Sequence, residues 1–155
     1  ILIKGANVFL GYFKNEEATK AVFTKDGWFR TGDMGVVDED GCLFIKGRSK
    51  CMILGPSGQN IYPEEVETVI NSQPYVVDSL VVEDDGGLTA LIYPDFAQGA
   101  KDGMNQDTFI KYIEDTLPEL NKELPNYAKL KKIEVMSEDF ERTPKKSIKR
   151  YLYQR

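Results

Sequence analysis

The sequence predicts a small α+β domain of short hairpins, a mixed sheet and about three helices, preceded by a β-rich segment. Strand-like and helix-like stretches are interspersed along the 155 residues instead of being grouped into separate halves. Two pairs of apolar stretches are joined by acidic turns that contain glycine, which is the usual pattern of a β-hairpin. A hydrophobic content of 41% is enough for a folded core.

The first fifty residues favour strands around one short helix. The predicted elements, in order, are a strand within residues 1–12, a helix opening at Asn15, a strand after the turn at residues 26–27, and a hairpin over residues 36–48. Asn15 is a good helix cap, and the two glutamates that follow it suit the positive end of the helix dipole.

Residues 51–155 alternate between the two kinds of element. The predicted elements are a short strand over residues 51–54, a glycine-containing loop over 55–60, a helix from Pro63, a hairpin over 75–94, a helix from Asn105, a strand over 129–136 and a final helix near Ser147. Proline is well suited to the first turn of a helix, which supports the start at Pro63. Pro118 lies inside an apolar helical pattern, so we expect it to kink or split the helix that Asn105 begins.

The chain contains no histidine, which excludes Ser-His-Asp and Cys-His catalysis and removes the commonest zinc ligand. Its two cysteines, Cys42 and Cys51, cannot complete a tetrahedral metal site, so no metal site is expected. Both lie in apolar runs, and we expect buried, reduced thiols in a cytoplasmic protein. No apolar run approaches the roughly 20 residues that span a bilayer.

Charge is distributed unevenly along this acidic chain, whose net charge is -5. From Lys129 onward, nine Lys and Arg residues face four Asp and Glu residues. A basic end on an acidic body indicates an anionic partner, although a solvated cationic helix face would produce the same pattern.

Three motifs together carry a family resemblance. They are DGWFRTGDMG at residues 26–35, IKGRSKCMILGPSGQNIYPEEVE at residues 45–67, and LPNY at 124–127 followed by ERTPKKSIKR at 141–150. In this order they resemble the C-terminal part of the AMP-forming acyl-CoA synthetases, or adenylate-forming enzymes. The sequence SGQNIYPEEVE, residues 57–67, is most similar to the long-chain fatty acid–CoA ligases. The resemblance implies that residues 1–49 end the large nucleotide-binding domain, and that residues 50–155 form a mobile domain hinged at Lys50.

The resemblance also assigns roles to single residues. Asp33 would bind the ribose of ATP, Arg48 would contact the nucleotide during adenylation, and the loop of Gly58 would line the tunnel for the pantetheine arm of CoA. Each residue also has a simpler interpretation: a turn aspartate bonded to its own backbone, a surface salt bridge and a plain loop glycine. We interpret Glu64, Glu65 and Glu67 as solvated charges at a helix start, with ordinary pKa values.

The family's adenylation lysine is not at its usual place. Family members show a Thr, three residues, then that lysine, Ile or Val, one residue and a basic residue. Aligned on Thr143 and Ile148, this chain has Ser147 at the position of the lysine. Because a lysine is a mobile point charge on a long stem, a one-residue slip in a flexible loop can be absorbed, and Lys146 is our preferred substitute. Lys145 and Lys149 are the alternatives.

The function implied by the resemblance is ATP-dependent ligation of a fatty acid to CoA, with ATP, Mg2+ and CoA as cofactors and Mg2+ ligands outside this chain. No phosphate-binding loop or acyl pocket is recognisable, so we expect the chain alone to be inactive. Alternatives are another adenylate-forming enzyme, such as an acyl–carrier-protein ligase or an amino-acid-activating module, and a non-enzymatic anion-binding domain. Nucleic acid is not expected as a partner, because the basic segment lacks interleaved aromatics before Tyr151. Peripheral membrane association of the parent enzyme is compatible with this reading.

Overall fold

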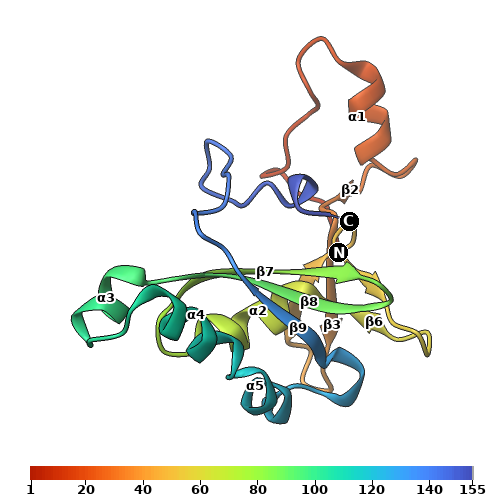
Figure 1. The fold of residues 1–155 in the computed structure, drawn as a ribbon. Helices are drawn as coiled ribbons and strands as arrows, with labels where there is room; N and C mark the ends of the chain where they lie inside the picture. The colour runs from red at the N-terminus through yellow and green to blue at the C-terminus, as the bar shows by residue number, and fades with distance from the viewer. Residues whose placement is uncertain (155) are drawn as a thin grey trace. The chain divides into compact units, whose positions relative to one another are not determined.

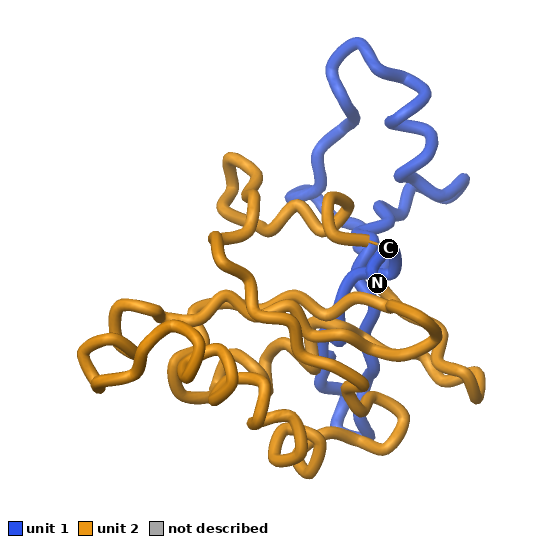
Figure 2. The backbone as a smooth tube through the Cα atoms, in the orientation of Figure 1, with its two compact units in different colours: residues 1–51 blue, residues 52–155 orange. Residues whose placement is uncertain are grey.

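A computed structural model describes residues 1–154. The chain divides into two compact units, Ile1–Cys51 and Met52–Arg155, which are coloured separately in Figure 2. Within the described residues, no helix has the length and apolar character needed to cross a membrane.

The first unit consists of short strands and one helix. Its elements are β1 (Leu2–Ile3), α1 (Glu16–Val22), β2 (Phe29–Arg30), β3 (Asp33–Val37) and β4 (Leu43–Arg48). The side chain of Asn15 accepts a hydrogen bond from the backbone N–H of Ala18, at 3.0 Å, and so caps α1 as predicted. Strands β3 and β4 pair antiparallel, which confirms the first predicted hairpin, whereas only two residues of the strand expected within residues 1–12 are β-structure.

The second unit is built on a three-stranded sheet. Its elements are β5 (Ile53–Leu54), β6 (Asn60–Ile61), α2 (Pro63–Asn71), β7 (Val76–Asp84), β8 (Gly87–Pro94), α3 (Phe96–Lys101), α4 (Gln106–Glu114), α5 (Leu117–Glu123), the 3-10 turn η1 (Asn126–Ala128), β9 (Leu130–Val135) and the 3-10 turn η2 (Arg150–Leu152). The sheet order is β7-β8-β9, with β7 and β8 antiparallel and β8 and β9 parallel. Strand β7 is therefore an edge strand.

Both faces of this sheet are buried, and this explains the long apolar runs of β7 and β8. Helices α2, α4 and α5 lie on one face, and the segment that follows β9 crosses the other face (Figure 1). Alternation along β7 divides its side chains between the two layers: Val81 packs toward the helices, while Leu80 and Val82 pack with Phe140 of the C-terminal segment.

Most of the predicted elements of this unit are confirmed, and two details differ; one expectation for the first unit also fails. Pro118 lies in the first turn of α5 and separates it from α4, as expected. The helix predicted near Ser147 is wrong, because Arg142 and Ile148 form an antiparallel bridge and only the short turn η2 follows. Helix α3 was not predicted, although Asp95 caps it. The burial expected for the cysteines is also wrong: Cys42 is exposed and Cys51 is half-buried.

Helix α3 depends on a glycine packed against the core. A Cβ atom added at Gly99 would lie 2.8 Å from two ring carbons of Phe109, which is itself only 2% exposed. We expect Gly99→Ala to lower the free energy of unfolding by about 1–3 kcal/mol through overpacking, despite the better helix propensity of alanine. Urea denaturation measures the effect. In a Phe109→Leu background the ring is absent, so the same substitution should cost much less; an equal cost in both backgrounds would contradict the clash.

Candidate functional site

The hairpin of β3 and β4 brings two of the predicted site residues together. Asp33 and Arg48 lie opposite each other in the β-ladder, and Nη1 of Arg48 is 2.5 Å from Oδ1 of Asp33. The same nitrogen donates to the carbonyl oxygen of Thr31 at 3.3 Å. The side chain of Asp33 is 29% exposed and that of Arg48 is 60% exposed, so the pair lies at the surface of its unit.

This pairing sets the ionisation of the aspartate. The hydrogen bond from Arg48 lowers the pKa of Asp33 below its ordinary value, against a smaller opposing effect of burial. Asp33 is thus a carboxylate at neutral pH, able to accept hydrogen bonds from neighbouring hydroxyls. The simpler interpretation of Arg48 as a salt-bridge partner describes the contact seen; the nucleotide roles of both residues stay predictions.

The glycine before this aspartate occupies a left-handed conformation. Gly32 has φ of 78°, a region that favours glycine, and its carbonyl oxygen accepts from the backbone N–H of Ser49 at 2.9 Å. The predicted hinge residue, Lys50, follows in an exposed turn, where the backbone N–H of Cys51 donates to the carbonyl of Arg48 at 3.0 Å. Hinge motion at Lys50 stays a prediction.

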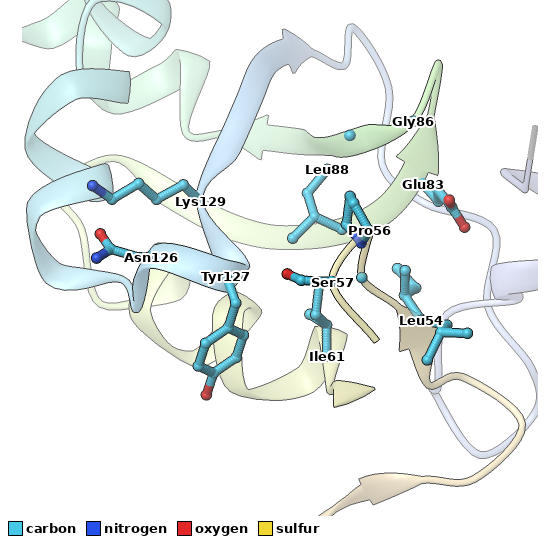
Figure 3. A pocket seen from close by; sticks show the side chains of 13 residues that line it. Leu54, Pro56, Ser57, Ile61, Glu83, Gly86, Leu88, Asn126, Tyr127 and Lys129 are labelled. Atoms are coloured by element: carbon cyan, nitrogen blue, oxygen red, sulfur yellow. The ribbon is translucent and has the colours of Figure 1, made fainter. Parts of the chain in front are cut away.

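The loop of Gly58 joins β5 to β6 and borders a pocket of the second unit. Gly58 has φ of 82°, and its N–H donates to the carbonyl of Gly55 at 2.8 Å, so a tight turn requires its conformational freedom. Gly55, Pro56 and Ser57 line a pocket of about 260 Å³, together with residues of the β7–β8 hairpin and of η1 (Figure 3). Gly58 is not among the lining residues. The CoA-tunnel role of the loop stays a prediction.

The basic segment, residues 141–150, contains a tight turn. The backbone N–H of Thr143 donates to the carbonyl of Ser147, and that of Lys146 donates to the carbonyl of Thr143, both at 2.8 Å. Lys146 has φ of 64°, a left-handed conformation that is uncommon for a residue with a side chain. Lys145, Lys146 and Ser147 are all exposed at this turn. The structure thus presents the two lysines to solvent, and their catalytic roles stay predictions.

The other cations of the segment are paired with carboxylates. Arg142 contacts Asp78 of β7 at 2.9 Å and Asp139 at 2.8 Å. Lys149 contacts Glu141 at 2.8 Å, and this hydrogen bond raises the pKa of Lys149. An ion pair with a local carboxylate makes Lys149 a weaker candidate for a mobile catalytic charge than Lys146.

Glu67 lies in an environment that differs from the one predicted for it. Predicted as a solvated charge with an ordinary pKa, it is instead 8% exposed. It accepts from the backbone N–H of Val81 at 2.7 Å and from the guanidinium of Arg150. Burial raises the pKa of Glu67, and the charge of Arg150 and the Val81 N–H oppose that effect. The prediction was therefore wrong for Glu67.

A sequence signal for this burial existed. Pro63, Val66 and Ile70 are the buried apolar residues of α2, and Glu67 lies four positions after the first of them and one after the second. That spacing places it on the inward face of the helix. Of the neighbouring glutamates, Glu65 is exposed as predicted, whereas Glu64 is half-buried.

Residues 1–154 contain no group of three or more Cys, Asp or Glu side chains that could hold a metal ion.

Comparison with known proteins identifies the class. Residues 51–155 match the family described as the AMP-binding enzyme C-terminal domain. A structure of MatB from Rhodopseudomonas palustris with ATP bound is 33% identical, with a TM-score of 0.72 over 98% of this chain and 29% of MatB. A structure of the o-succinylbenzoate CoA synthetase MenE from Bacillus subtilis, in complex with its acyl-adenylate intermediate, is 29% identical, with a TM-score of 0.74 over 98% of this chain and 29% of MenE.

A curated relative extends the match. The long-chain-fatty-acid–CoA ligase FadD15 of Mycobacterium tuberculosis is 33% identical over 170 aligned positions, which cover 97% of this chain and 28% of the ligase. The fold is that of the adenylate-forming enzymes. The chain belongs to the AMP-binding enzyme C-terminal domain family, and the predicted resemblance and fold class are confirmed. It spans little more than a quarter of the length of these relatives.

The pairing of Asp33 with Arg48 has a measurable consequence. Replacing the guanidinium by an uncharged chain in Arg48→Met should raise the pKa of Asp33 toward its ordinary value, because the hydrogen bond and the positive charge are both lost. The stabilisation by this pair is present above the unfolded-state pKa of Asp33 and is lost as the pH falls through its lower folded-state value. Carboxyl-carbon NMR titration follows Asp33 directly. Arg30→Met, at an exposed position of β2, is the matched control; equal titration in both variants would contradict the assignment.

Proposed function

We propose that the chain is the C-terminal part of an AMP-forming acid–thiol ligase that joins a fatty acid to CoA. The observation that supports this most strongly is the family match over residues 51–155, combined with the cross-strand pairing of Asp33 and Arg48 just before them. FadD15, a long-chain-fatty-acid–CoA ligase, supports the fatty-acid substrate. We place the parent enzyme in the cytoplasm, with peripheral membrane association as part of the proposal.

In the first half-reaction, a carboxylate oxygen of the fatty acid attacks the α-phosphorus of ATP. The phosphoanhydride bond breaks, pyrophosphate leaves, and an acyl-adenylate forms. Asp33 would accept hydrogen bonds from the ribose hydroxyls through its ionised carboxylate, and Arg48 would donate from its fixed fork of N–H groups. Because the two side chains already converge, the nucleotide would meet an ordered pair of opposite charges.

The exposed lysines of the basic turn would act in the same step. Charge grows on the oxygens around phosphorus during the attack, and a nearby ammonium group stabilises it. Lys146 is the first candidate and Lys145 the second, because both are exposed at the turn. Lys149 already pairs with Glu141.

In the second half-reaction, the CoA thiol attacks the acyl carbon and AMP leaves. Rotation about Lys50 would withdraw the basic turn and present the Gly58 loop to the pantetheine arm. The pocket beside that loop supports this assignment, since Gly55, Pro56 and Ser57 bring backbone and small side chains to its wall. A carrier-protein thiol as the acceptor is the alternative, in which case the parent would be an acyl–carrier-protein ligase or an amino-acid-activating module.

The part of the chain before the family match is consistent with a larger parent. Val37, Leu43 and Ile45, on the β3–β4 hairpin, have more than half of their surface exposed. Apolar side chains at this density on a hairpin usually contact further protein.

We predict that the isolated chain has no ligase activity, because neither a phosphate-binding loop nor an acyl pocket is recognisable in its sequence. The chain incubated with ATP, Mg2+, oleate and CoA should give no oleoyl-CoA above the enzyme-free background by mass spectrometry. The full-length parent, assayed in parallel, is the positive control. Oleoyl-CoA from the chain alone would refute the prediction.

In the full-length parent, Lys146→Ala should slow acyl-adenylate formation by about a hundredfold or more, since a charge that stabilises the transition state is removed. It should spare thioester formation from supplied acyl-adenylate, because the turn acts only in the first step. Pyrophosphate release and thioester formation measure the two steps separately. Lys111→Ala, at an exposed position of α4, is the control. An equal loss in both steps would argue against Lys146.

A further inference from the structure

The turn that presents Lys145 and Lys146 is flanked by two arginines, and each has a carboxylate partner on another part of the unit. Arg142 stands before the turn and Arg150 after it. The first contacts Asp78, and the second contacts Glu67. Both connections lead to the same place, the edge strand β7.

The Arg150 connection passes through a buried side chain. The side chain of Glu67 is 11% exposed and that of Arg150 is 22% exposed. One carboxylate oxygen of Glu67 accepts from Arg150, and the other accepts from the Val81 N–H of β7 at 2.7 Å. The Val81 N–H lies at the outer edge of β7, and within residues 1–154 Glu67 takes the position that a further strand would fill.

Arg142 contacts β7 directly, through Asp78, which precedes Val81 on the same strand. Asp78 of β7 accepts from Arg142 through Oδ2 and from the backbone N–H of Ser79 through Oδ1, at 2.9 Å in each case. Arg142 also donates to the carbonyl of Lys146 at 3.3 Å, inside the turn itself. The guanidinium thus ties the turn backbone to β7.

We propose that Glu67 and Asp78 are positioning residues, which hold the Lys145–Lys146 turn on β7 through Arg150 and Arg142 so that its lysines are in place for adenylation. This inference rests on the proposed function of the turn. Neither carboxylate needs to touch a substrate. A lysine side chain is long and mobile, so the position of its ammonium group is well defined only if the backbone that carries it is held in place.

The substitution Glu67→Gln should remove the contact that anchors the turn while keeping the contact that supports the folded sheet edge. The amide oxygen of glutamine can still accept from the Val81 N–H, which preserves the contact with the strand edge. Its NH2 group offers only donors to Arg150, which has only donors itself, so the anchor is lost. Asp78→Asn removes the negative charge from the other anchor and serves as the second variant. Glu138→Gln, an exposed carboxylate in the same C-terminal segment, is the matched control.

Amide hydrogen exchange reports the anchoring in the chain itself. The N–H groups of Thr143 and Lys149 donate at 2.8 Å within the turn and its stem, to Ser147 and Glu141. In Glu67→Gln we expect exchange at both amides to quicken by about tenfold, with Leu91 N–H in the sheet unchanged. Glu138→Gln should leave all three unchanged. Unchanged exchange at Thr143 and Lys149 in both anchor variants would overturn the proposal.

The rates of the two half-reactions, measured separately in the full-length parent, test whether the anchors position the lysines of the turn. We expect Glu67→Gln to slow acyl-adenylate formation by about tenfold to a hundredfold, and to leave thioester formation from supplied acyl-adenylate within about twofold. Loss of folded protein would lower both steps together. Faster exchange with both steps unaffected, or both steps lowered equally, would overturn the positioning role.

Failure of the proposed function has a different signature. A wild-type parent that forms no acyl-adenylate from any carboxylic acid tested would overturn that function, and with it the role of the anchors in adenylation. The exchange measurement would still decide whether Glu67 and Asp78 hold the turn.

Discussion

One buried carboxylate joins three segments of the C-terminal unit. Glu67 projects from α2, accepts from the Val81 N–H at the sheet edge, and binds Arg150 of the C-terminal segment. A buried carboxylate without partners costs several kcal/mol, so removing either contact leaves a poorly compensated charge or an unpaired backbone donor. The helix layer, the edge of the sheet and the opposite layer are therefore coupled through this one side chain. Apolar packing on each face supplies the bulk of the stability, but it does not specify how the two layers are registered.

The same arrangement explains a basic segment at the end of an acidic chain. Its two arginines, Arg142 and Arg150, form ion pairs with Asp78 and Glu67, a contact that suits the planar guanidinium group. Lys149 forms an ion pair with Glu141, eight residues earlier. The remaining charges, on Lys145 and Lys146, are carried by exposed, flexible side chains. Under the proposal, two roles are thus divided between two kinds of cation. The arginines would fix the backbone of the turn, and the lysines would carry the charge that stabilises a phosphate.

Local signals predicted the elements whose causes are local. Asn15 as a cap, Pro63 at a helix start and Pro118 as a helix divider act within a few residues of themselves, and all three were read correctly. Arg48 was placed near Asp33 only through the family resemblance, and the β-ladder explains their meeting. The burial of Glu67 was missed although its place on the inner face of α2 signalled it; its partners could not be predicted, because they lie 14 and 83 residues away along the chain. The final helix predicted near Ser147 was also wrong, because Arg142 pairs with Asp78, which is distant in sequence, and forms a backbone bridge with Ile148.

The backbone conformation of the basic turn affects whether Lys146 can replace the family's adenylation lysine, whose position Ser147 occupies. Lys146 holds a left-handed conformation that costs a residue with a side chain about 1–2 kcal/mol, whereas glycine would adopt it freely. Such strain persists only where the surroundings impose it, here the Thr143–Ser147 hydrogen bond and the bridge between Arg142 and Ile148. Neighbouring residues on a turn of this kind point in different directions, so a lysine at 146 does not simply replace one at 147. If Lys146 acts in adenylation as we propose, its four-carbon stem must make up the difference, and it can do so only if the turn beneath it stays fixed. Under that proposal, the departure from the family pattern makes the anchors at the two ends of the turn more important in this chain, not less.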